Sequence, residues 1–313
     1  MNIKRIINKN GKLIWYVSLI IVFVFIAIKS LNSYYEKDEE IKKVQAAEDD
    51  KISKVTQDTT NTNTSYSTES KSMPKAVSSF VNYCNNKELE NAYKMLTEEC
   101  KKAMFPTIEI FEETYINNTF NITRTYELEK WSTEGNKTTY LISLYGNILA
   151  TGGADNYIQD YYTLIENDNG VYRLNINNYI YGEDKNIETT VNNITVKLGN
   201  VDVYEDHEEA TITITNNSSK MISLTGNRYR ENIYLKNLEG IEYSSLNSEF
   251  DNEELVLKPH TSQTYIVEFN KSYSSNNKAS YLVLSDVILD YEEYINSNNK
   301  NNYSNRTNIT VKY

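Results

Sequence analysis

The chain has 313 residues, enough for two ordinary domains of about 100–150 residues and a tail. Its mean hydropathy of -0.60 excludes a protein with many membrane spans, while 39% hydrophobic residues suffice for a core. A net charge of -11 repels phosphate backbones and disfavours nucleic-acid binding.

An uncharged segment near the amino end predicts a membrane helix. It begins at Leu13, ends at Ile28 and has a lysine on either side. As a helix rising about 1.5 Å per residue, it nearly crosses a bilayer core. Basic residues precede it, so the positive-inside rule leaves residues 1–12 in the cytoplasm and the bulk of the chain outside. We expect an uncleaved signal anchor over residues 13–29; a cleaved signal peptide and a buried core helix are the alternatives.

Residues 30–73 form a polar stretch rich in charged residues and then in Thr, Ser and Asn. This composition buries too little apolar surface to offset chain entropy, and it predicts a disordered stalk. Apolar residues at helical spacing, Ile41, Val44 and Ile52, leave a short coiled coil as the alternative.

Helical spacing followed by alternation characterises residues 74–183. Helical patterns begin at Pro74, Leu89 and Pro106. Alternating apolar and polar residues then predict four strands, over residues 125–131, 138–148, 157–166 and 171–179. Helices followed by an antiparallel meander indicate an α+β domain.

This region resembles the NTF2-like family of cone-shaped α+β domains. The similarity is carried by FVNYCNNKELENAYKMLTEECKKAMF and YRLNINNYI, and it covers residues 74–182. The resemblance implies a cone with a concave sheet, in a family that includes isomerases, dehydratases, transport factors, and conjugation and secretion channel subunits. Enzymes of the family carry a His or an Asp/Tyr set inside the cone. Both histidines of this chain, His207 and His260, lie beyond the region.

Residues 184–313 alternate without a sustained helical pattern. We expect about seven short strands, over residues 194–203, 210–215, 233–236, 255–257, 264–269, 281–284 and 287–289. The segments TITITNNSSK, NIYLKNLEGIEY and TYIVEF resemble the immunoglobulin-like domains at the end of Gram-positive surface proteins. The expected fold class is therefore α+β: a single transmembrane helix, an NTF2-like cone and an immunoglobulin-like antiparallel β-sandwich.

The two cysteines, Cys84 and Cys100, both fall in the first folded region, outside the predicted membrane segment. An oxidising compartment permits a disulfide between them, and the loop that it closes would stabilise the fold by about 3 kcal/mol. Two buried thiols are the alternative. A metal site at this pair is not expected, because no histidine is near.

The best candidate ligand pocket in the cone consists of Asp155, Tyr157, Asp160 and Tyr162, where strands of the cone could face an interior. The alternative is that these are half-buried strand residues. The acidic run at residues 205–209 matches no calcium loop and predicts a hairpin turn. No catalytic residue, metal or cofactor is expected.

These features predict a non-enzymatic, membrane-anchored extracellular protein of a bacterial, low-GC Gram-positive envelope. Its partners would be the lipid bilayer, through the segment from Leu13 to Ile28, and an unidentified envelope protein or wall component. A homo-oligomer is possible. The alternatives are a conjugation or secretion channel subunit and an NTF2-like enzyme or carrier for a small apolar ligand.

Overall fold

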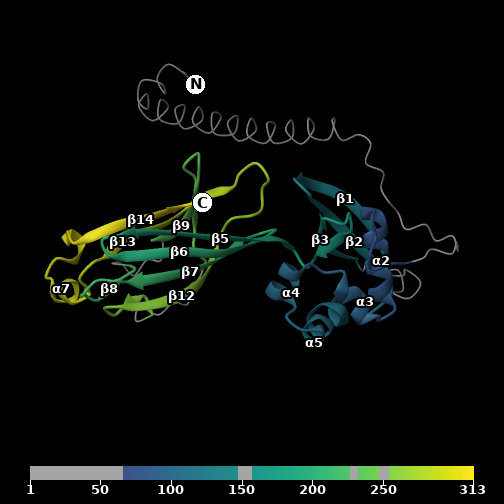
Figure 1. Ribbon diagram of the computed structural model, residues 1–313, viewed down its shortest axis with the longest axis horizontal. Helices are drawn as coiled ribbons and strands as arrows, with labels where there is room; N and C mark the ends of the chain where they lie inside the picture. Colours follow the sequence, from purple (N-terminus) through teal and green to yellow (C-terminus); the bar gives the residue numbers. More distant parts are fainter. Residues whose placement is uncertain (1–65, 147–156, 226–231, 247–253) are drawn as a thin grey trace, which may run out of the picture. The chain divides into compact units, whose positions relative to one another are not determined.

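The computed structural model describes residues 66–146, 157–225, 232–246 and 254–313 (Figure 1), all within one compact unit. The first described elements are short helices: α2 (Met73–Asn85), α3 (Leu89–Lys94), α4 (Glu98–Met104), α5 (Ile108–Phe111), the π-helical η1 (Glu112–Ile116) and α6 (Asn117–Thr119). Thr97 and Thr107 begin α4 and α5, because each side-chain oxygen accepts a hydrogen bond from a backbone N–H three residues on. Because a new helix begins at each of these threonines, α4 and α5 are separate short helices.

An antiparallel sheet follows, with its strands in chain order: β1 (Arg124–Glu134), β2 (Lys137–Gly146), β3 (Tyr157–Glu166) and β4 (Tyr172–Asn175). The predicted turn before β4 is present, with Gly170 in the left-handed region at φ 71°. One face of the sheet packs on the helices through a core that includes Phe80, Phe111 and Leu164. The helices and this sheet are called the first module below.

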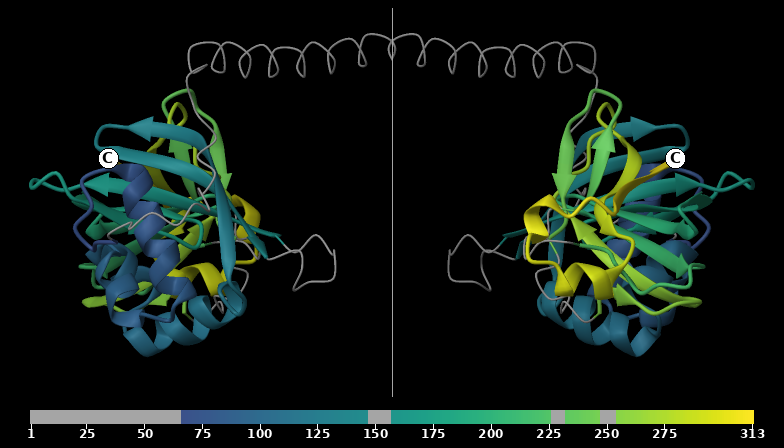
Figure 2. Two further views of the ribbon diagram at one scale, coloured as in Figure 1. Left: turned by 90° about the vertical axis from the view of Figure 1, so that its right-hand side faces the viewer. Right: turned by 90° about the vertical axis from the view of Figure 1, so that its left-hand side faces the viewer.

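The second module contains two sheets (Figures 1 and 2). One has the order β12-β7-β6-β5, from β5 (Tyr179–Val191), β6 (Ile194–Tyr204), β7 (Glu208–Asn216) and β12 (Thr261–Phe269). The other has the order β10-β9-β13-β8-β11, with β14 also paired to β13. Its strands are β8 (Ile222–Ser223), β9 (Ile233–Asn237), β10 (Glu242–Ser244), β11 (Val256–Leu257), β13 (Ala279–Ile288) and β14 (Arg306–Lys312). The helices α7 (Tyr291–Asn296) and η2 (Lys300–Asn302) lie between β13 and β14 in the chain.

Period-two alternation builds these sheets. In β7 every second residue is buried, including Ala210, Ile212 and Ile214, while the threonines between them are half-buried on the other face. Thr213 Oγ1 lies 2.9 Å from Thr264 Oγ1 of β12, a cross-strand hydroxyl pair. Because the apolar residues of both sheets face each other, they form one buried cluster between the sheets.

Strand β5 carries residues of both cores. Tyr179 belongs to the core of the first module, and the next residue, Ile180, belongs to that of the second. Successive strand residues point to opposite sides, so one strand can contribute to both. The predicted domain boundary after residue 183 lies within this strand, and the division into an NTF2-like and an immunoglobulin-like domain stays a prediction.

The predicted α+β class with a transmembrane helix is wrong. The described residues are 48% strand and only 21% helix, so β-structure dominates. The helices predicted after Pro74 are present but short, and new helices begin at the N-caps Thr97 and Thr107, whereas strand alternation continues from Arg124 onward. Among the described residues, no helix is long and apolar enough to cross a membrane. The segment from Leu13 to Ile28 and the predicted stalk up to residue 65 lie outside the described residues.

Replacing Gly182 with alanine is expected to lower the free energy of unfolding by about 1–3 kcal/mol, the usual range for overpacking. A Cβ at this position in β5 would lie 2.5 Å from Tyr179 Oη and 2.7 Å from Asp202 Oδ1. These two atoms already share a hydrogen bond of 2.8 Å. Denaturant unfolding measures the change, and a Tyr179→Phe background supplies the control, since it removes one clashing atom. Equal costs in the two backgrounds would refute the steric explanation.

Candidate functional site

The four residues of the predicted cone pocket do not form a pocket together. Asp155 lies outside the described residues. Tyr157 is 53% exposed and packs beside the ring of Tyr145. Asp160 and Tyr162 are both buried on the face of β3 that packs on the helices, where Phe80 meets Tyr162 edge to face. Only this last pair is brought together, within the protein core.

Asp160 is engaged by its own chain. Its carboxylate accepts hydrogen bonds from Tyr115 Oη at 2.8 Å and from three backbone N–H groups, those of Tyr161, Asn177 and Asn178. Asn177 and Asn178 both have positive φ, near 61° and 62°, which is the left-handed region. Burial raises the pKa of the Asp160 carboxyl, and these hydrogen bonds oppose the rise. The group therefore stabilises the turn that leads from β4 into β5.

Both cysteines lie in the core of the first module, and the predicted disulfide stays a prediction. Cys84 at the end of α2 and Cys100 in α4 are both free and fully buried. Burial raises the pKa of the Cys100 thiol to about 12, so this thiol stays protonated near neutral pH. Such a group behaves as a small apolar core residue.

The turn between β6 and β7 consists of residues 205–207, so only part of the acidic run at residues 205–209 forms the predicted turn, and Glu208 and Glu209 already belong to β7. His207 stacks on the ring of Tyr204 at 4.2 Å, and its Nδ1 lies 2.7 Å from Asp206 Oδ1. One member of the run departs from the expected solvated face, because Glu208 is buried. This residue belongs to the inward-facing positions of β7.

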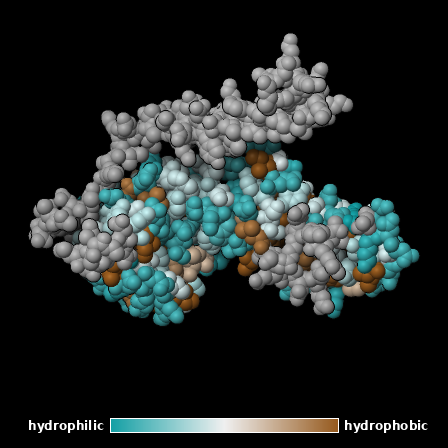
Figure 3. Space-filling model, turned by 180° about the vertical axis from the view of Figure 1, so that it is seen from behind, coloured by the Kyte–Doolittle hydropathy of each residue, from teal (hydrophilic) through white to brown (hydrophobic). Residues whose placement is uncertain are grey.

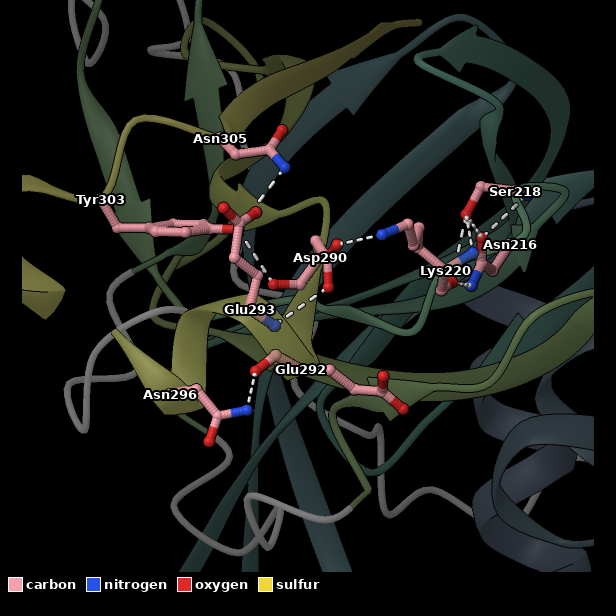
Figure 4. Close-up of polar contacts among 9 residues, drawn as sticks. All are labelled: Asn216, Ser218, Lys220, Asp290, Glu292, Glu293, Asn296, Tyr303 and Asn305. Atoms are coloured by element: carbon pink, nitrogen blue, oxygen red, sulfur yellow. Dashed lines mark hydrogen bonds and ion pairs between the residues drawn. The ribbon is translucent and has the colours of Figure 1, made fainter. Parts of the chain in front are cut away.

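A second polar cluster surrounds the start of α7 (Figure 4). Asp290 caps this helix by accepting a hydrogen bond of 3.0 Å from the Glu293 N–H, and it pairs with Lys220 Nζ at 2.6 Å. Tyr303 Oη donates to Glu293 Oε2 at 2.9 Å. These contacts stabilise the helix end and the turn beside it. Within the part of the chain that the structure describes, no group of His, Cys, Asp and Glu is arranged to hold a metal ion.

The best candidate site is a cavity of about 40 Å³ in the second module. Strand β5, the start of β7, the segment between β12 and β13, and the residue after β14 contribute its walls. The polar side chains that line it include Tyr181, Glu208, Lys271, Tyr273, Lys278 and Tyr313. We call it the Tyr313 cavity. On the face shown in Figure 3, by contrast, hydrophobic residues form only small separate patches on the described surface.

A buried ion pair forms one wall of the Tyr313 cavity. Lys271 Nζ lies 2.7 Å from Glu208 Oε1, and the two side chains are only 2% and 7% exposed. Burial raises the pKa of the Glu208 carboxyl, and the ammonium group of Lys271 opposes the rise. The Glu208–Lys271 pair offers hydrogen-bond donors and acceptors in a wall shielded from water, and such groups can recognise a polar group of a ligand.

An unpartnered hydroxyl forms another wall. Tyr313 Oη is buried and has no hydrogen-bond partner among the described residues. Burial, followed by the nearby Glu208 carboxylate, raises the pKa of this phenol well above its usual value, so it is a neutral donor and acceptor.

Aromatic rings continue outward from the Tyr313 cavity. Tyr273 lines the cavity and lies 5.3 Å from the ring of Trp131 on β1. Trp131 also contacts Tyr161 at 4.4 Å, yet 40% of its surface remains exposed. The residues that line the Tyr313 cavity were not among the site residues predicted from the sequence. For Glu208 a signal was available, because the alternation of β7 extends back from Ala210 to this position.

No family model matches the chain, and no curated protein matches its sequence.

Proposed function

We propose that this protein is a binding protein of the bacterial cell envelope, held at the membrane by its amino-terminal segment and contacting another envelope component with its β-rich region. The resemblances to NTF2-like and immunoglobulin-like domains belong to this proposal, as does the extracellular location. The two resemblances and the extracellular location derive from the sequence.

The Tyr313 cavity is the observation that supports binding. It is preformed, it contains a desolvated ion pair and a hydroxyl with unused hydrogen-bonding capacity, and its wall residue Tyr273 contacts the exposed ring of Trp131. Polar groups fixed in a concave site beside aromatic surface are typical of recognition sites. Asp160, one of the four residues of the predicted cone pocket, is instead occupied by four hydrogen bonds within the core.

Photo-crosslinking in intact native cells tests the proposal. A photoreactive amino acid at Trp131, beside the Tyr313 cavity, is expected to attach envelope material. The same amino acid at Ile295 of α7, which is 46% exposed, serves as the matched control and is expected to attach less. Mass spectrometry identifies what is attached.

Two outcomes would contradict the proposal. Crosslinks to cytoplasmic proteins alone would remove the extracellular location. Crosslinks to copies of the same chain together with membrane-channel subunits would replace it with the conjugation or secretion alternative.

A further inference from the structure

The size of the Tyr313 cavity limits what can enter it. Its volume is about 40 Å³, whereas one water needs about 10–15 Å³ on this measure and a benzene-sized guest about 150 Å³. A hydroxyl or hydroxymethyl group fits, but a whole ring does not. The guest must therefore be a larger molecule that projects a small group inward.

The walls of the cavity require that this small group form hydrogen bonds. A buried hydroxyl without a hydrogen-bond partner is unfavourable, and Tyr313 Oη has no such partner among the described residues. Lys271 Nζ, with three donors, and Glu208, with two carboxylate oxygens, lie in the same walls. A hydroxyl group is both donor and acceptor, so it can satisfy Tyr313 and the ion pair together.

The charges around the cavity favour a neutral guest. Each lysine that lines it is paired with a carboxylate: Lys271 with Glu208, Lys185 with Glu183, and Lys278 with Glu134. A charged guest would compete with one of these pairs and would lose its own hydration. A neutral polar guest disturbs none of them.

The aromatic rings beside the cavity favour a guest with an apolar face. Tyr273 leads from the cavity wall to the exposed ring of Trp131. Such rings offer flat apolar area with little conformational freedom to lose on binding. A sugar ring combines the required features, because it has C–H faces, no charge, and hydroxyl or hydroxymethyl groups at its edge.

We propose that the Tyr313 cavity and Trp131 form a binding site for a neutral saccharide, which inserts one hydroxyl-bearing group between Tyr313 and the Glu208–Lys271 pair and stacks its ring on Trp131. The inference rests on the proposed binding function and names its ligand class.

Tryptophan fluorescence of the purified full chain tests this site directly. The chain has two tryptophans, so a Trp15→Phe background makes Trp131 the sole reporter. The probes are maltohexaose and the hexamer of N-acetylglucosamine, with oligogalacturonate as the charged comparison. At least one neutral probe is expected to change the fluorescence of Trp131 in a saturable way.

Two variants assign the binding to the site. Tyr313→Phe, which removes one hydroxyl, is expected to weaken binding about two- to tenfold, the loss of one hydrogen bond. The matched control Tyr157→Phe removes an exposed hydroxyl and is expected to leave Kd unchanged. Trp131→Ala, followed by calorimetry, is expected to abolish binding.

The proposal is overturned if neither neutral probe binds, if oligogalacturonate binds more tightly, or if Tyr313→Phe binds as the parent does. Crosslinking to an envelope protein at Trp131 in cells would then leave the proposed function standing without its saccharide ligand, so the two failures are distinguishable.

Discussion

Replacing Asp160 with alanine is expected to lower the free energy of unfolding by about 3–5 kcal/mol, because several buried donors lose a charged acceptor at once. The donors are Tyr115 Oη and the N–H groups of Tyr161, Asn177 and Asn178. The last two belong to a turn in which both residues have positive φ, and this strained turn depends on the carboxylate. Urea unfolding followed by circular dichroism measures the loss.

Two further variants separate the hydrogen bonds of Asp160 from its volume. Asp160→Asn preserves the size but points N–H donors at other donors, so it should cost nearly as much as alanine. Asp168→Ala removes an exposed carboxylate from the turn before β4 and should change stability little. If Asp160→Asn is as stable as the parent, the carboxylate does not hold the turn.

The alternation of side chains along a strand places Asp160 and Tyr162 on the same face of β3, and this shared face was predictable from the sequence. The sequence did not show which face of β3 packs on the helices, because alternation does not specify what covers each face. The helices α2 to α6 cover the face that carries Asp160, and a carboxylate that could have faced a ligand became part of the core. A polar residue at a buried strand position and one at a ligand-binding strand position follow the same alternating pattern in a sequence.

The Tyr313 cavity shows a different limit of sequence analysis. Alternation from Ile214 back through Ala210 predicts that Glu208 points inward, yet its acidic neighbours favour a solvated turn. Its partner Lys271 follows β12, and Tyr313 follows β14. Their meeting depends on the register of strands far apart in the chain, which no local pattern specifies.

Replacing Lys271 with methionine is expected to lower the free energy of unfolding by about 3–5 kcal/mol, since it leaves the Glu208 carboxylate buried without its ion pair. The two groups lie 2.7 Å apart with almost no exposure. The double variant Glu208→Gln/Lys271→Met should cost clearly less than the sum of the single changes. Denaturant unfolding of the parent, the two single variants and the double variant gives the coupling free energy between Glu208 and Lys271.

A pair of the same residue types with an exposed carboxylate provides the control. Lys101 Nζ and Glu98 Oε1 are also 2.7 Å apart, but the Glu98 side chain is 86% exposed and the Lys101 side chain 18%. Removing this pair should cost no more than about 1 kcal/mol, because water screens it. Equal losses at the two pairs would mean that burial is not what makes Lys271 necessary.

The same pair predicts a pH dependence with a definite sign. Burial raises the pKa of Glu208 in the folded state above its ordinary value of 4.5. Between these two pKa values the folded state therefore keeps a proton that the unfolded state has already released. Stability from this group is greatest below pH 4.5 and is lost as pH rises through the folded pKa. Glu208→Gln should remove that part of the stability profile, measured as the difference between the two proteins at each pH. A difference that does not change with pH across this window would show that Glu208 titrates alike in both states, and the pair would then offer a permanently charged wall to whatever enters the cavity.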